Sequence, residues 1–194
     1  MVKIKKIKGR QVFDSRGNPT VEAEVFSDNE SALAIMPSGA STGTHEAFEL
    51  RDTDNKKYLG KSVFKAIDNI NGPISNALKN IDPNNQKEID KILINLDGTE
   101  QKKKLGANAI LAVSIASCKL ASKEKKISIF EHLSNTKDFR LPIPLLNIIN
   151  GGVHAKNDLD IQEFMIRPEN TSSFSESMRK SFLVIQNLKK MLDT

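Results

Sequence analysis

The chain has 194 residues, 38% of them hydrophobic, and a formal net charge of +5. This length allows one or two domains with a real hydrophobic core, and no apolar run approaches the roughly eighteen residues of a membrane-spanning helix. The amino terminus, MVKIKKIKGR, lacks the apolar stretch of a signal peptide. The single Cys118 can form no internal disulfide, which agrees with a buried structural thiol in a reducing compartment. We therefore expect a cytoplasmic protein without a membrane span.

The basic charge is distributed along the chain. Lysines cluster within the first eight residues and again at 102–104, while the others are scattered among Asp and Glu. Aromatic residues make up only 5% of the chain and Trp is absent, so the stacking platform of single-strand-binding proteins is missing. We interpret the basic residues as solvated surface and do not expect direct binding of nucleic acid.

The first part of the chain predicts a meander of three strands. The second strand has the clearest pattern, because Val21, Ala23 and Val25 alternate with glutamates, as in a half-buried antiparallel strand. The turn before it, DSRGNP, is dense in turn-forming residues. The predicted strands span residues 2–13, 20–26 and 31–36.

A loop of small residues, PSGASTGT at 37–44, follows the third strand. A loop of this kind, with glycines at 39 and 43, could present several backbone N–H groups to an anion, or it could fold over a ligand as a flexible lid. An ordinary mobile connection would have the same composition. The residues alone leave both interpretations open.

From residue 62 the hydrophobic period changes to that of a helix. Gly72 and Pro73 predict a kink or a break between two helices, and Asp97-Gly98 predicts the end of another. The predicted helices of this part span residues 62–70, 74–78, 89–96, 107–120 and 128–133. Because the strands come first and the helices follow, the fold class is α+β.

The stretch 142–168 predicts two short strands joined by a polar loop, after a double proline that favours an extended backbone. The loop contains a Gly pair and His154, which could be an acid, a base, a ligand or simply a solvated loop residue. Gln162 and Glu163 lie in the second apolar run, where a polar side chain needs a partner or a cavity. Both can face one pocket only near a bulge or a strand end. A helix is expected at 174–192.

Four long runs carry a resemblance to a known family. They are FDSRGNPTVEAEV, MPSGASTGTHEAFELRD, DGTEQKKKLGANAILAVSIA and NIINGGVHAKNDLDIQEFMI. In this order they resemble enolase, the first three its amino-terminal domain and the last the opening of its catalytic barrel. The resemblance covers nearly the whole chain. It implies an enolase-like α+β domain at 1–135 and, at 142–194, the first two strands and first helix of a TIM-type α/β barrel. Such a barrel needs about 250 residues, so a truncated chain is expected.

Enolases are magnesium-dependent lyases of glycolysis that dehydrate 2-phosphoglycerate to phosphoenolpyruvate, and a lysine base with Mg²⁺ is typical of the superfamily. The resemblance implies that Ser41 is a ligand of the second Mg²⁺, in a mobile loop with Ser38, Gly39, Ala40, Thr42 and Gly43. It implies substrate contacts for His154, Gln162 and Glu163. The family's base, acid and remaining metal carboxylates lie beyond the matched segment. We therefore expect this chain to be inactive alone, and the full-length protein to be a homodimer.

A non-catalytic α+β domain that binds a partner is the alternative function. Its lysine-rich surface or the exposed strands after residue 142 would then form the contact. The remaining candidate groups receive no role: His45, Asp158 and Asp160 are expected to be solvated loop residues, and His132, in the predicted helix at 128–133, a surface residue.

Overall fold

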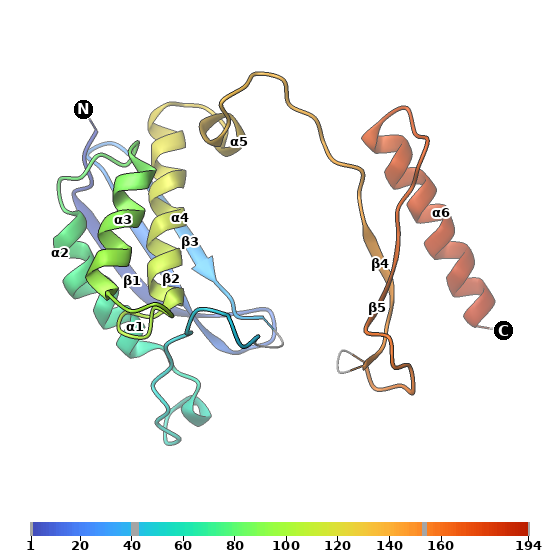
Figure 1. Ribbon diagram of the computed structural model, residues 1–194, viewed down its shortest axis with the longest axis horizontal. Coiled ribbons are helices and arrows are strands. Elements are labelled where there is room, and N and C mark those ends of the chain that lie inside the picture. Colours follow the sequence, from blue (N-terminus) through green and yellow to red (C-terminus); the bar gives the residue numbers. More distant parts are fainter. Residues whose placement is uncertain (1, 40–42, 153–154, 194) are drawn as a thin grey trace. The chain divides into compact units, whose positions relative to one another are not determined.

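The computed structural model describes residues 2–39, 43–152 and 155–193. Contacts divide the chain into two compact units, residues 1–135 and 136–194. Each unit is described by itself below (Figure 1).

The first unit contains the predicted antiparallel meander, with the strand order β1-β2-β3. The strands are β1 (Lys6–Phe13), β2 (Pro19–Phe26) and β3 (Ser31–Met36). The prediction of the meander is confirmed, although the first strand begins at Lys6 rather than at residue 2. The reason is that Ile4 exchanges backbone hydrogen bonds with Asn80 and Ile81, after the second predicted helix, instead of pairing within the sheet.

The predicted helices are also present. They are α1 (Phe64–Asn69), α2 (Ser75–Leu78), α3 (Gln86–Asp97), α4 (Ala107–Glu124) and α5 (Ile129–Leu133), with a short 3₁₀ turn at Tyr58–Gly60. The kink predicted at Gly72 and Pro73 is a π-helical turn, Ile70–Ile74, that joins α1 to α2. Gly98 ends α3 in the left-handed conformation, with φ of +69°.

The core lies between the sheet and the helices. Figure 1 shows α4 along one face of the sheet with α3 beside α4, and α4 packs against β2 and β3. The inward side chains of β2, Val21, Ala23 and Val25, are fully buried, as the alternation predicted. A Cβ on Gly9 would lie 3.0 Å from the side chain of Ile70. Glycine in β1 therefore permits this close approach of strand and helix.

The second unit contains β4 (Leu146–Asn150), β5 (Glu163–Ile166) and α6 (Phe174–Leu192). These are the two strands and the helix that the sequence predicts. The strands pair antiparallel. Parallel strands need a long crossover connection, usually an α-helix. The described residues of the loop between β4 and β5 form no α-helix. In the described part of the chain, no helix combines the length and the apolar character needed to cross a membrane.

Candidate functional site

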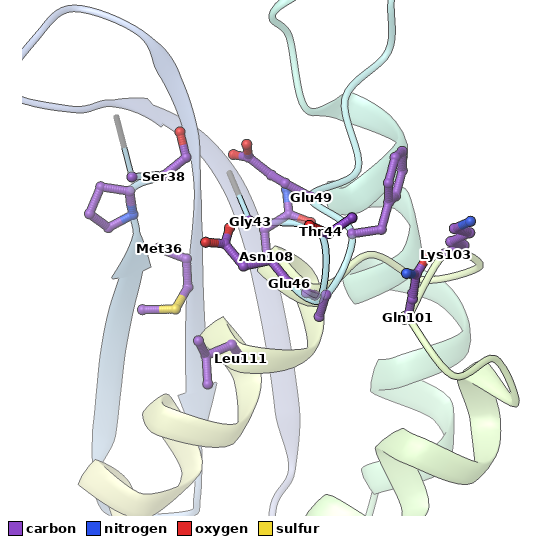
Figure 2. Close-up of a pocket in the computed structure, with 15 residues that line it drawn as sticks. Met36, Ser38, Gly43, Thr44, Glu46, Glu49, Gln101, Lys103, Asn108 and Leu111 are labelled. Atoms are coloured by element: carbon purple, nitrogen blue, oxygen red, sulfur yellow. The ribbon is translucent and has the colours of Figure 1, made fainter. Parts of the chain in front are cut away.

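A pocket of about 640 Å³ lies in the first unit, between the segment after β3 and the N-terminal end of α4. Figure 2 shows Met36 and Ser38 on the β3 side, and Asn108 and Leu111 projecting from α4. Its lining combines apolar walls with hydroxyl, amide and charged groups, including Thr44, Glu46, Glu49, Gln101 and Lys103. Such a mixture is typical of a site that orients a polar ligand.

The segment after the loop, which includes the pocket-lining residue Phe48, is held by hydrogen bonds. The N–H of Phe48 donates to the carbonyl oxygen of Gln101 (2.7 Å), and the N–H of Ala107 donates to that of Phe48 (2.8 Å). The Asn108 amide bonds both backbone groups of Leu50, accepting from N–H at 3.2 Å and donating to C=O at 3.1 Å. A side-chain amide can replace a strand partner in this way because it carries both a donor and an acceptor.

Gly106 makes this packing possible. Its φ is +92°, and a Cβ at this position would lie 2.5 Å from both the Asn108 side chain and the Cβ of Leu50. Glycine at position 106 avoids both the strain of a positive φ and the steric clash that a Cβ would cause. The roles of Gly106 and Asn108 leave no signal in the sequence, since neither residue interrupts a hydrophobic pattern.

The predicted loop residues divide into two groups. Ser41, Ala40 and Thr42 lie outside the described residues. Ser38, Gly39 and Gly43 all line the pocket, and the carbonyl oxygen of Gly43 accepts the N–H of Glu46 at 3.2 Å. His45 is exposed, close to these residues in sequence.

The hairpin of the second unit carries a polar face. Glu163 pairs with Asn150, and the register shifts between Asn147 and Ile149. Because of this irregularity, the side chains of Asn147 and Asn150 lie on one face and hydrogen-bond to each other. Strict alternation would place residues 147 and 150 on opposite faces, so the sequence analysis missed this pair of asparagines.

Gln162 immediately precedes β5, and Glu163 is its first residue; both are exposed. Both side chains therefore lie at a strand end, which is where Gln162 and Glu163 could face the same pocket. The carbonyl oxygen of Gln162 accepts the N–H of Gly151 at 2.9 Å, which closes the loop between the strands. His154 belongs to this loop but lies outside the described residues.

Gly151 tolerates no side chain. A Cβ at this position would lie 2.4 Å from the carbonyl oxygen of Ile161 and 2.6 Å from the Cβ of Leu159. The next residue, Gly152, has φ of +55°, and its N–H donates to the carbonyl oxygen of Leu159 at 2.6 Å. The Gly pair therefore permits the close return of the chain that places Gln162 and Glu163 at the start of β5.

Within the described residues, no three His, Cys, Asp or Glu side chains form a group that could hold a metal ion. Magnesium prefers an octahedral shell of oxygen ligands, usually with carboxylates among them. The described part of the chain does not make such a site by itself.

Comparison with known proteins identifies the family of the chain. The family model described as the N-terminal domain of enolase matches residues 4–133, and the model of the C-terminal TIM barrel domain of enolase matches residues 138–194. The chain belongs to the enolase family. A similar relative is an enolase of Pelagibacter ubique (strain HTCC1062), which is 60% identical over 192 residues. The match covers 99% of this chain and 46% of that enolase, so the chain spans about half the length of its curated enolase relative.

Family membership explains the two-part architecture. The α+β unit corresponds to the enolase N-terminal domain, and the hairpin with α6 corresponds to the start of the barrel domain, without a closed barrel.

Proposed function

We propose that this chain provides the amino-terminal domain (1–135) and the first barrel elements (142–194) of an enolase, which dehydrates 2-phosphoglycerate to phosphoenolpyruvate. The observation that carries the proposal is the 60% identity to a curated enolase over 99% of the chain. Two enolase domain models matched in the family's order support it.

The dehydration removes a weakly acidic proton from carbon 2 and expels a hydroxyl group, so negative charge develops on the substrate. Preorganised positive charge and hydrogen-bond donors stabilise such an intermediate. Mg²⁺ is the proposed cofactor and supplies this charge when bound, with Ser41 as one oxygen ligand. A single hydroxyl cannot complete an octahedral shell, so further oxygen ligands are required beside Ser41.

The polar end of the hairpin is proposed to contact the substrate. An ionised carboxylate only accepts hydrogen bonds, so Glu163 would accept one from a substrate hydroxyl group and would avoid the phosphate. Gln162 offers both a donor and an acceptor from its amide. His154 completes the proposed set, as a proton donor or hydrogen-bond partner.

A cytoplasmic location and a homodimeric full-length protein are part of the proposal. The free, buried Cys118 supports a reducing compartment. Family membership is the support for the homodimer and for the small-molecule substrate.

A chimera tests the proposal directly. Residues 1–194 would be joined in frame to the remaining carboxyl-terminal part of the Pelagibacter enolase, and phosphoenolpyruvate formation would be followed with and without Mg²⁺. We expect a magnesium-dependent activity in the chimera and none in the 194-residue chain alone. The variant Glu163→Gln in the chimera should lower kcat/KM by about tenfold or more, as expected when a hydrogen bond to a charged group is lost.

The result separates enolase from the alternative partner-binding domain. A chimera that melts cooperatively but forms no phosphoenolpyruvate would contradict the enolase proposal and favour a non-catalytic role. Activity of the 194-residue chain alone would contradict only the part of the proposal that assigns the missing groups to the rest of the protein.

A further inference from the structure

Arg16 links two segments that are 22 residues apart in the sequence. It lies in the turn between β1 and β2, and its Nη2 donates to the carbonyl oxygen of Ser38 at 2.7 Å, just beyond the end of β3. A longer contact of 3.5 Å reaches the carbonyl oxygen of Gly39. A charged donor makes a stronger hydrogen bond than a neutral one, so this contact can hold the start of the loop after β3.

The turn that carries Arg16 is itself well ordered. The Asp14 carboxylate accepts the N–H groups of Arg16 (2.9 Å) and Asn18 (2.8 Å), and these bonds, led by that from Asn18, lower the pKa of Asp14 despite its partial desolvation. Gly17 takes the positive φ of +75° that the turn requires. The Lys61 ammonium group donates to the side-chain oxygen of Asn18 at 2.9 Å, which is a further hydrogen bond to this turn.

The antiparallel sheet explains why these two segments meet. Val21 at the start of β2 pairs with Met36 at the end of β3, and the Thr20 hydroxyl donates to the carbonyl oxygen of Met36. The β1–β2 turn and the segment 37–39 therefore lie at the same end of the sheet. Arg16 extends the contact between them beyond the last ladder pair.

The segment that follows the loop is held by different groups. Asn108 and the backbone of Gln101 bind residues 48–50, as described above. Substitution of Arg16 should leave these bonds unchanged, so the two segments can be tested separately.

We infer that Arg16 is a positioning residue, which fixes the backbone of Ser38 and Gly39, two residues that line the pocket, through its guanidinium group. The inference rests on the proposed function for its catalytic consequence, while its structural part is independent of that function. Arg16 is not proposed to contact the substrate. It acts through the backbone it holds.

The first test uses the 194-residue chain and nuclear magnetic resonance relaxation of backbone amides. In Arg16→Gln we expect the order parameters of Ser38 and Gly39 to fall from near 0.85 to below about 0.6, the range of flexible backbone. Arg16→Lys, which keeps a charged donor, should retain part of the order. The control, Arg140→Gln, removes an arginine whose side chain is 86% exposed and should change neither value.

Unchanged order parameters in Arg16→Gln would overturn the inference, and so would low values already present in the parent chain. The melting temperature should stay within a few degrees, because Arg16 is exposed at the surface. If Arg16→Gln fails to fold, Arg16→Lys replaces it: order parameters of Ser38 and Gly39 below those of the parent chain support the inference, and unchanged values overturn it.

The second test uses the chimera described under the proposed function. Arg16→Gln should lower kcat by about tenfold with little change in KM, because displacement of Ser38 and Gly39 in the pocket wall impairs the geometry of the reaction rather than the contacts of the bound substrate. An active chimera in which Arg16→Gln leaves kcat unchanged would overturn the positioning role. An inactive chimera would contradict the proposed function, while the order parameters would still decide whether Arg16 anchors the backbone of Ser38 and Gly39.

Discussion

The carboxylate of Asp97 accepts the backbone N–H of Leu105 at 2.7 Å and so closes the loop between α3 and α4. Its other oxygen accepts the N–H of Thr99 at 3.0 Å and the Thr99 hydroxyl. Asp97 is only 2% exposed and Leu105 is equally buried. This loop carries Gln101 and Lys103 into the wall of the pocket, so one buried carboxylate shapes part of the candidate site.

Asp97→Asn should destabilise the first unit by about 1–3 kcal/mol, because an amide nitrogen would face a buried N–H group and leave it without an acceptor. Urea denaturation followed by circular dichroism measures the free energy of unfolding. Asp138→Asn is the matched control, since the Asp138 side chain is 76% exposed, and a change within about 0.5 kcal/mol is expected there. Equal effects of the two substitutions would contradict this role of Asp97.

Acid should destabilise the protein through Asp52 and Asp97. Burial alone would raise the pKa of each carboxyl, but hydrogen bonds from Lys65, Ser62 and Phe64 to Asp52, and from Thr99 and Leu105 to Asp97, outweigh burial and lower the pKa overall. The unfolded chain therefore binds protons at a higher pH than the folded one. The stabilisation is present above the unfolded pKa of about 3.9 and is lost as the pH falls through the lower folded value.

The measurement is the free energy of unfolding between neutral pH and about pH 3, the region in which Asp side chains titrate. In the double variant Asp52→Asn, Asp97→Asn the loss of stability on acidification should be smaller than in the parent chain. A decline of the same size in both proteins would show that other groups are responsible.

Leu93→Ala should cost about 2–5 kcal/mol of stability, because Leu93 on α3 is fully buried in the core and its truncation leaves a cavity. Ile94→Ala is the matched control. Ile94 is the next residue of the same helix but is 48% exposed, so its effect should be well below that of Leu93→Ala. Denaturant midpoints with unchanged slopes give both values, and a reversed order would contradict the assignment of the core.

Gly151→Ala should disrupt the loop between β4 and β5, since its Cβ would lie far inside the contact distances to Ile161 and Leu159. Hydrogen exchange of a peptide that covers 146–166 should become faster. Gly72→Ala serves as the control, because nothing lies within 4 Å of a Cβ at that position and its φ is not positive. Unchanged exchange in Gly151→Ala would show that the loop can adjust to the extra carbon.

Periodicity and turn chemistry were sufficient to predict the order and type of the elements. The alternation of Val21, Ala23 and Val25 predicted the buried face of β2, and the predicted discontinuity at Pro73 is the π-helical turn. These predictions succeed because they rest on local properties: a strand repeats every two residues, a helix every 3.6, and proline has no backbone N–H. The family could be recognised from the sequence because four long runs of residues resemble enolase segments in the same order.

Contacts between distant segments could not be derived in this way. Neither the hydrogen bond from Arg16 to Ser38 nor the amide pairing of Asn108 with Leu50 leaves a periodic signal, since each depends on how two elements meet. The polar face shared by Asn147, Asn150 and Glu163 depends on a register irregularity that reverses the expected alternation. The amino-acid sequence thus determined the elements, their buried faces and the family, because local chemistry controls them. Only the tertiary structure decided which backbone groups each polar side chain holds, because a hydrogen bond requires atoms within about 3 Å.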